Sequence, residues 1–289
     1  MSWRSLLITQ HSKLTYKMNH LVITTQTDVI QVPIDDVRVV IVGTTRAAVT
    51  SYAVMEIIKH DIKLIFTSEN GMPIGEINRY HGHTSRNINI LKQFKWSDMR
   101  KQQLWQLMIQ TKITVQQQVL EETSNNSEAM DKLVDSVEVG DETNREAVAA
   151  RLYFPRLFGK NFTRRDDKQV QNGALNYGYG ILIANLAREI SEFGYLTELG
   201  IHHDNANNEF NLANDLMELF RPLVDRIVYL QDKGELTNAM KGDLINVINL
   251  SVGWNGKETQ ITTVITEVVR TSLLFLEEKS ELPEWRIEI

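Results

Sequence analysis

The sequence predicts an α+β protein with a small N-terminal β-rich domain followed by a larger α-helical domain. Short runs of Val, Ile, Leu and Thr dominate the chain before about Asn78, as is typical of strands. Helical periodicity dominates after that point. No apolar run approaches the roughly 18 residues of a membrane span. We therefore expect a β-rich domain over residues 1–78 and an α-helical domain over residues 79–289.

The N-terminal part is predicted to form short strands with polar breaks between them. Met18-Asn19-His20 suits a hairpin turn, and Ala47–His60 has the apolar spacing of a helix. Strands are expected at Arg4–Thr9, Leu14–Lys17, Leu21–Thr25, Val29–Val32, Arg38–Val42 and Ile62–Phe66, before a turn over Glu69–Pro73.

The C-terminal part is predicted to be helical. In Ser97–Glu122 the apolar side comprises Met99, Leu104, Leu107, Met108, Ile113 and Val119, opposite a Gln-rich side. Further helices are expected at Ser127–Val137, Asn144–Leu157, Val170–Phe193, Leu212–Leu230, Asn238–Ile248 and Thr263–Leu276. Asn255-Gly256 is a turn signal, and Glu281–Ile289 is expected to be a loosely held tail.

Composition restricts the function classes. The absence of cysteine excludes disulfides, thiolate metal sites and cysteine nucleophiles. The first residues lack the apolar core of a signal peptide, so we expect a cytoplasmic protein with no membrane partner. The net charge is −6, but residues 79–117 hold seven Lys or Arg against one acid. Residues 118–150 hold nine acids against two bases. A basic face for nucleic acid is therefore compatible with the acidic total, as is an ordinary division of solvated helix faces.

Familiar catalytic signatures are missing from the sequence. It contains no P-loop, no Gly-x-Ser-x-Gly elbow and no His-Glu-x-x-His pair. Gly173, Gly178 and Gly180 lie in a helical stretch without the strand and spacing of a dinucleotide fingerprint. We expect these glycines to permit close helix packing.

Three segments could carry chemistry. Glu146 lies in the first turn of a predicted helix, where Asp141-Glu142-Thr143 can cap it and where a Glu is also common for its effect on the helix dipole. His202-His203 follow an apolar helix in a loop. Asp215 and Glu218 are three apart on one helical face, although a solvated carboxylate pair would look the same. Pro222 indicates a kink or a helix start.

Two carboxylates and one imidazole would suit a hard divalent ion such as Mg²⁺ or Mn²⁺, with positions left for phosphate oxygens. Such a site can activate a hydroxyl group and neutralise charge on a phosphate. Sequence spacing does not show that the three segments meet. The residues alone therefore indicate a helical protein with a possible dependence on metal.

Taken together, the segments resemble the universal CRISPR adaptation integrase, in the short form found beside single-protein (type II) effector nucleases. The likeness runs over nearly the whole chain, and the order and spacing of its motifs make it specific. It is carried by Trp3-Arg4, by His-Ser-Lys-Leu-x-Tyr-Lys at His11–Lys17, by Asn144-Arg145-Glu146 with Ala-Ala-Arg-x-Tyr-Phe, by Asn176-Tyr177-Gly178-Tyr179, by Gly200-x-x-His203, by Asp215-x-Met217-Glu218-x-Phe220-Arg221-Pro222, and by Asn255-Gly256-Lys257-Glu258.

The resemblance implies a β-rich dimerisation domain, a helical catalytic domain and a metal site that uses a Glu, a His and a further acid. By motif position these ligands fall on Glu146, His203 and Glu218, and Asp215 is an additional, assisting acid. The chain departs from the family pattern at Leu219, where relatives carry Pro, and at Ala147-Val148, where relatives often carry Gly and His. These departures lie outside the ligand positions and put only fine geometry in doubt.

The implied reaction is metal-assisted transesterification on Mg²⁺ or Mn²⁺. Free 3′-hydroxyls of a double-stranded DNA fragment would attack phosphodiesters at the ends of a CRISPR repeat. The implied assembly is a homodimer joined by a small partner subunit, with the effector nuclease as a further candidate partner. Candidate phosphate contacts are Arg79, Arg86, Arg145, Lys160 and Arg221, while His11 could stack on a duplex end. The competing functions are a non-catalytic DNA-binding scaffold and a stand-alone metal-dependent endonuclease.

Overall fold

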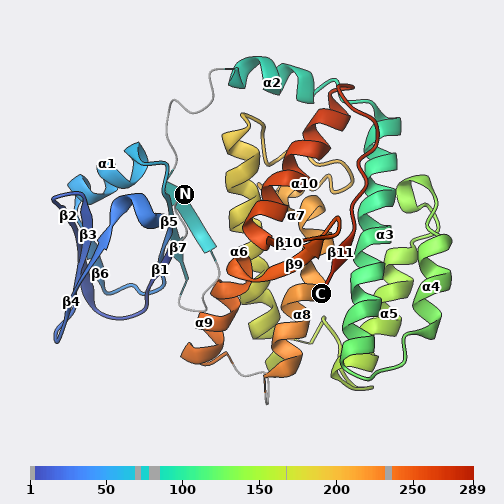
Figure 1. The fold of residues 1–289 in the computed structure, drawn as a ribbon, viewed down its shortest axis with the longest axis horizontal. Helices are drawn as coiled ribbons and strands as arrows, with labels where there is room; N and C mark the ends of the chain where they lie inside the picture. Colours follow the sequence, from blue (N-terminus) through green and yellow to red (C-terminus); the bar gives the residue numbers. More distant parts are fainter. Residues whose placement is uncertain (1–3, 69–72, 78–84, 167, 232–235) are drawn as a thin grey trace. The chain divides into compact units, whose positions relative to one another are not determined.

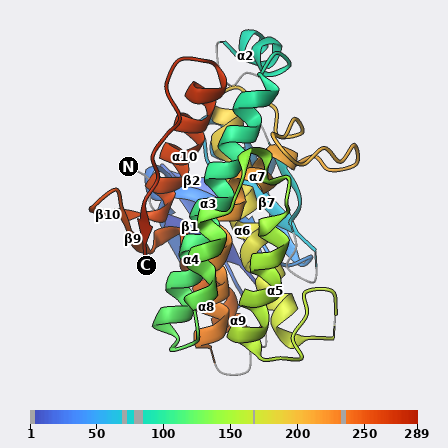
Figure 2. The same cartoon turned by 90° about the vertical axis from the view of Figure 1, so that its right-hand side faces the viewer.

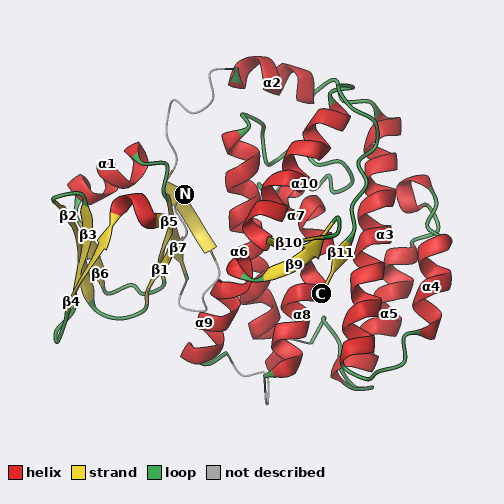
Figure 3. Cartoon of the chain, in the orientation of Figure 1, coloured by secondary structure: helices red, strands yellow, loops and turns green. Residues whose placement is uncertain are grey.

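The structure is a computed structural model of the chain. It describes residues 4–68, 73–77, 85–166, 168–231 and 236–289. The chain divides into two compact units, Met1–His81 and Gly82–Ile289. Strands make up most of the first unit and helices most of the second, which confirms the predicted α+β class (Figures 1 and 3).

The N-terminal unit holds two sheets. In one, β1 (Arg4–Ile8), β5 (Val37–Val42) and β7 (Lys63–Thr67) run parallel, and β8 (Pro73–Ile77) pairs antiparallel with β7. In the other, β4 (Val29–Pro33), β3 (His20–Thr24) and β2 (Ser12–Lys17) are antiparallel, and the short β6 (Ala47–Val49) pairs parallel with β2. A 3₁₀ turn, Ile34–Asp36, and helix α1 (Ser51–Lys59) complete the unit.

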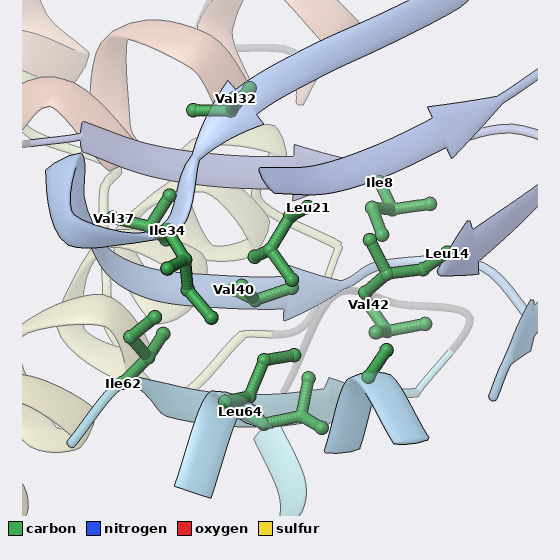
Figure 4. Close-up of a cluster of buried hydrophobic side chains, with 12 residues drawn as sticks. Ile8, Leu14, Leu21, Val32, Ile34, Val37, Val40, Val42, Ile62 and Leu64 are labelled. Atoms are coloured by element: carbon green, nitrogen blue, oxygen red, sulfur yellow. The ribbon is translucent and has the colours of Figure 1, made fainter. Parts of the chain in front are cut away.

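The core of this unit is aliphatic and draws on both sheets. Leu14 and Leu21 from one sheet and Val40 and Leu64 from the other are fully buried in a single cluster (Figure 4). The run Val-Arg-Val-Val-Ile-Val of β5 is continuously apolar apart from Arg38, because its strand lies between two neighbours in a parallel arrangement. The two sheets therefore share one hydrophobic core.

Several predicted boundaries in the N-terminal unit need correction. The helix expected from Ala47 begins only at Ser51, because residues 47–49 pair with β2 and Thr50 caps the helix by accepting from Ala53 N at 3.3 Å. Strand β8 was not predicted. The Met18-Asn19 turn is confirmed, since both residues have the positive φ that a two-residue hairpin needs.

The helical unit is built around two long helices, α3 (Asp98–Glu122) and α6 (Val170–Glu192). α3 contacts α4, α5, α8 and α10, while α6 contacts α7, α8, α9 and α10 (Figure 2). The surrounding elements are α2 (Arg86–Gln93), α4 (Glu128–Asp135), α5 (Arg145–Phe158), α7 (Asn211–Met217), α8 (Arg221–Leu230), α9 (Asn238–Asn246) and α10 (Ile261–Leu276), with 3₁₀ turns at Val139–Asp141, Glu218–Phe220 and Val247–Asn249.

The predicted helices of this unit are present, with corrections. α2 was not predicted, and the expected helix Leu212–Leu230 is divided by the 3₁₀ turn Glu218–Phe220 before α8 begins with Pro222 in its first turn. Met99, which was predicted on the apolar side of this helix, is exposed. The buried residues of α3 begin at Leu104, and from there they lie around much of the helix circumference. Of the glycines in α6, Gly178 approaches α8 so closely that a Cβ would lie 2.5 Å from Val224 Cγ1, whereas a Cβ on Gly173 would meet no atom.

The predicted loose tail is wrong. β11 (Ile287–Glu288) pairs with β9 (Ser251–Trp254), which also pairs with β10 (Lys257–Gln260), so the helical unit carries a small antiparallel sheet. Ile287 is only 3% exposed, and its carbonyl accepts from Gln118 Nε2 at 2.8 Å. The segment is too short and too polar for its sequence to predict a strand. Its apolar side chains Trp285 and Ile287 are nevertheless buried.

We expect Ile287→Ala to lower the free energy of unfolding on the order of 2–5 kcal/mol, because it removes buried methyl groups and leaves a cavity. Thermal or denaturant unfolding measures the change. Glu284→Ala, which alters an exposed side chain of the same segment, is the matched control and should leave stability within about 0.5 kcal/mol. Equal effects of the two substitutions would contradict the docked arrangement.

Candidate active site

Glu146 lies in the first turn of α5, at a carefully capped helix start. Asn144 is the N-cap and accepts from Ala147 N at 3.2 Å. The buried Asp141 accepts from the backbone N–H groups of Arg145 and Glu146, at 2.7 and 3.0 Å. These acceptors satisfy N–H groups that have no partner within the helix. The capping expected from the Asp141 segment is therefore confirmed, and it fixes the backbone of Glu146.

Glu218 begins the 3₁₀ turn that separates α7 from α8. Its side chain is only 4% exposed. Because Pro222 has no N–H group and a fixed φ, it fits the first turn of α8 and marks the break between the two helices. The break turns the carboxylate of Glu218 toward α3.

Lys112 of α3 joins the two glutamates. Its Nζ lies 2.6 Å from Glu146 Oε1 and 2.6 Å from Glu218 Oε2. Arg221 contacts the other oxygen of Glu218, with Nε to Oε1 at 2.8 Å. Three elements far apart in sequence thus meet at one ammonium group. Sequence reasoning missed Lys112, although its spacing of four residues from Met108 and seven from Trp105 puts it on the buried side of the helix.

The charges at this centre perturb one another. Burial alone would raise the pKa of Glu218, but Arg221 and Lys112 outweigh it and lower that pKa to about 2. Burial would lower the pKa of Lys112, yet the neighbouring Glu218 and Glu146 carboxylates raise it. Both Glu218 and Lys112 are therefore charged at neutral pH, and each offsets the cost of burying the other.

His203 is held next to this centre by Asp215. The fully buried Asp215 accepts from His203 Nδ1 at 2.5 Å and from His203 N at 3.1 Å. Its other oxygen accepts from the backbone N–H groups of Ile201 and His202, at 2.7 and 3.1 Å. The hydrogen bond to Asp215 raises the pKa of His203, and Glu218 and Glu146 add to the increase. Because Nδ1 is engaged, Nε2 is the ring nitrogen left to bind a ligand.

The loop that carries His203 requires a glycine at position 200. A Cβ there would lie 2.3 Å from the carbonyl oxygen of His203 and 2.7 Å from Asp215 Oδ2. His202 points elsewhere: its ring stacks on Trp105, with centroids 4.0 Å apart and planes 2° from parallel. The His203 ring also meets Trp105, edge-on with centroids 5.8 Å apart, but of the two imidazole rings it is that of His203 that is hydrogen-bonded to Asp215.

A second layer of polar groups supports Arg221. Its guanidinium lies 4.6 Å from the centroid of the Tyr179 ring, and the Tyr179 hydroxyl donates to the buried Asp225. Burial raises the pKa of Asp225 to about 6. Arg164 also faces the Tyr179 ring, at 5.2 Å. This network was not predicted from the sequence.

The donor set suits a divalent metal ion in composition but is not arranged around one. Within the described residues, no three His, Asp or Glu side chains are grouped as metal ligands are. Glu146 and Glu218 instead converge on a cation of the protein's own, Lys112. Two carboxylates directed at one positive charge, beside an imidazole oriented by an acid, nevertheless match the oxygen and nitrogen ligands that Mg²⁺ or Mn²⁺ would take.

An open groove of about 420 Å³ lies beside His203. Its lining combines aromatic rings with polar and basic side chains, among them Phe94, Trp96, Lys101, Gln102 and His202. Phe94 is 67% exposed. Asp98 and Asp204 also line the groove, and of the three candidate ligands His203 is the one in its wall.

The remaining predicted contact residues lie at various places. Arg86 begins α2 and Lys160 follows α5, both exposed. Arg145 is partly buried, and among the described residues its Nε has no hydrogen-bond partner. His11 is exposed in the loop between β1 and β2 and therefore precedes the hairpin in which it was expected. Arg79 lies outside the described residues.

Two solved structures share the fold of this chain. A casposase bound to an integration product superposes with a TM-score of 0.80 at 20% identity, covering 96% of this chain and 92% of the casposase. A Cas6–reverse transcriptase–Cas1 chain, solved in complex with Cas2, gives a TM-score of 0.72 at 17% identity and covers 96% of this chain and 35% of that one. At these identities the likeness establishes the fold alone.

Sequence comparison establishes the family. The model of the CRISPR associated protein Cas1 family matches residues 6–243. The CRISPR-associated endonuclease Cas1 of Neisseria meningitidis serogroup C is 36% identical over 280 residues, which cover 93% of this chain and 90% of that protein. The chain belongs to the Cas1 family, and the predicted resemblance is confirmed. Among the described residues, no helix is long and apolar enough to cross a membrane.

We expect Gly200→Ala to destabilise the helical unit, because the new methyl group would collide with the backbone of His203 and the carboxylate of Asp215. Gly173→Ala is the matched control: it adds a methyl group in open space on α6 and should leave stability unchanged or raise it by up to about 1 kcal/mol. Thermal unfolding distinguishes the two. A Gly200→Ala protein as stable as the wild type would refute the close approach described above.

We also expect Asp215→Asn to lower the pKa of His203 toward its ordinary 6.5, because the carboxylate that favours the protonated ring is lost. NMR titration of the histidine ring in metal-free protein measures this pKa, and Asp204→Asn, an exposed neighbour, is the control. The pKa of His203 is higher in the folded than in the unfolded state, so the His203–Asp215 pair stabilises the wild type. This contribution is complete below about pH 6.5 and is lost as the pH rises through the raised pKa. An unchanged pKa in Asp215→Asn would contradict this assignment.

Proposed function

We propose that this protein inserts foreign DNA fragments into a CRISPR array by metal-dependent strand transfer, with Glu146, His203 and Glu218 as its metal ligands. The observation that carries the proposal is the convergence of two carboxylates, from α5 and from the α7–α8 junction, on a single positive charge beside an oriented imidazole. Support also comes from the relatives, of which one is an endonuclease and another is a casposase bound to an integration product.

In the proposed reaction, Glu146, Glu218 and Nε2 of His203 would hold Mg²⁺ or Mn²⁺. When bound, the ion would neutralise charge on the phosphate and lower the pKa of the attacking 3′-hydroxyl. The chain's own residues set up this site. Asp215 keeps the His203 ring in one orientation and makes Nε2 available, so we assign the assisting role predicted for it to positioning. Arg221 holds Glu218 from the opposite side.

The DNA would be bound mainly through its phosphates. Arg86 and Lys160 are exposed and Arg145, which precedes Glu146 in the chain, is partly exposed, so these three are the proposed phosphate contacts. Arg221 is bonded to Glu218 and would serve the site rather than the DNA backbone. His11, exposed in the loop before β2, would stack on a duplex end. Such binding weakens as salt rises.

The proposed assembly is a homodimer bridged by a small partner subunit. The N-terminal unit would form the dimer contact, because its edge strand β4 exposes Val29 and Ile30 along a row of unpaired backbone groups. The structural relative solved with Cas2 favours a second, smaller subunit of that kind. A CRISPR array as target would place the reaction in the cytoplasm.

We expect Glu146→Ala, His203→Ala and Glu218→Ala each to abolish strand joining while leaving salt-dependent DNA binding largely intact, because basic side chains supply most of the affinity. The assay supplies a duplex with free 3′ ends, a repeat-containing target and Mn²⁺, with and without a chelator, and scores products longer than either substrate. His202→Ala is the matched control and should retain substantial activity, since that ring packs on Trp105.

The same assay separates the competing functions. A non-catalytic scaffold would bind DNA and join nothing, whereas a stand-alone endonuclease would only shorten strands. Loss of joining in His202→Ala with activity retained in His203→Ala would show that the histidine register is wrong by one. Integration by all three alanine variants would refute the catalytic assignment.

A further inference from the structure

Lys112 is a charged residue in a place where charged residues are rare. Its side chain is 8% exposed, in the middle of a long helix in which Met108, Ile109 and Ile113 are also buried. Its two partners are Glu146 and Glu218, each at 2.6 Å. A buried lysine keeps its charge only where carboxylates compensate for lost water, and these two do so.

The oxygens used by Lys112 are the ones that a metal ion would need. Glu146 offers Oε1 to the ammonium, and Glu218 offers Oε2, because Arg221 already engages Oε1 of Glu218. An ammonium group and a divalent cation repel each other, so both cannot occupy the space between the same two oxygens. Occupation by one therefore excludes the other.

We propose that Lys112 is a tethered cation that competes with the divalent metal ion for Glu146 and Glu218, so that metal binds only when the ammonium leaves the two carboxylates. This inference rests on the proposed metal site. The lysine side chain is suited to such a role, since its charge sits on a flexible four-carbon stem that can swing without movement of α3. In the metal-free site the ammonium thereby neutralises the buried carboxylate of Glu218 and the partly exposed one of Glu146.

Competition of this kind has a measurable consequence. The apparent association constant for metal equals the constant of the free site multiplied by the fraction of molecules in which the carboxylates are free. If the bridged state is populated in about nine molecules out of ten, the wild type binds metal about tenfold more weakly than the same site without the ammonium. Lys112→Met keeps an unbranched side chain that is one atom shorter and removes the charge. We expect it to bind Mn²⁺ at least about tenfold more tightly than the wild type.

The experiment measures free Mn²⁺ by electron paramagnetic resonance during titration of the full-length protein. Lys132→Met, which removes an exposed lysine from α4, is the matched control and should bind like the wild type. Glu218→Gln, alone and combined with Lys112→Met, identifies the binding that belongs to this site. Tighter binding in Lys112→Met that disappears with Glu218→Gln is the expected result.

Two other results have separate meanings. If the wild type binds Mn²⁺ in a Glu218-dependent manner and Lys112→Met binds no more tightly, the competition is overturned while the proposed metal site stands. If neither protein shows Glu218-dependent binding, the proposed metal site fails and the competition fails with it.

A second measurement on the wild type covers the case in which Lys112→Met does not fold. Lysine side chains labelled with ¹³C at Cε are followed by NMR during titration with Mg²⁺, and the signal of Lys112 is assigned by its absence in Lys112→Arg. Release of the ammonium should move this signal toward the position of exposed lysines. A Lys112 signal that stays unchanged while the histidine signals report metal binding would overturn the proposal.

Discussion

The ion pairs that join the buried Lys112 to the buried Glu218 and to the partly exposed Glu146 are the constraint on which the helical unit depends. An ammonium and a carboxylate taken out of water cost several kcal/mol each unless close partners compensate. Here the compensation requires that α3, the start of α5 and the α7–α8 junction meet within hydrogen-bonding distance. Because α3 also packs against α4, α8 and α10, the position of the ion pairs and the position of most helices are determined together.

Around this centre, each charged group is held by a partner that is itself fixed. Both carboxylate oxygens of Asp215 accept hydrogen bonds from the loop that carries His203. Gly200 lets this loop approach Asp215 closely, because it has no Cβ. Arg221 lies between Glu218 and the face of Tyr179. The geometry thus depends on buried hydrogen bonds more than on exposed ion pairs, which contribute little where solvent screens them.

Much of this arrangement was predictable from the sequence, for identifiable reasons. Long helices such as α3 and α6 are predictable from their periodic pattern of apolar residues. The motifs around Glu146, His203 and Glu218 indicate the candidate ligands. α2 and β11 were missed, because short elements that depend on tertiary contacts carry little pattern of their own. Lys112 was missed for a different reason. A lysine among glutamines is normally at the surface, and only its register with Met108 and Trp105 indicates burial.

The order of these residues along the chain has a consequence for synthesis. Lys112 leaves the ribosome first, Glu146 follows 34 residues later, and Glu218 comes 72 residues after Glu146. Domains form from the N-terminus as the chain emerges. A nascent or prematurely terminated chain that ends before Glu218 therefore contains Lys112 and at most one of its two carboxylate partners, Glu146. Such a fragment cannot form both ion pairs of Lys112, and the centre is complete only after Glu218 has been made.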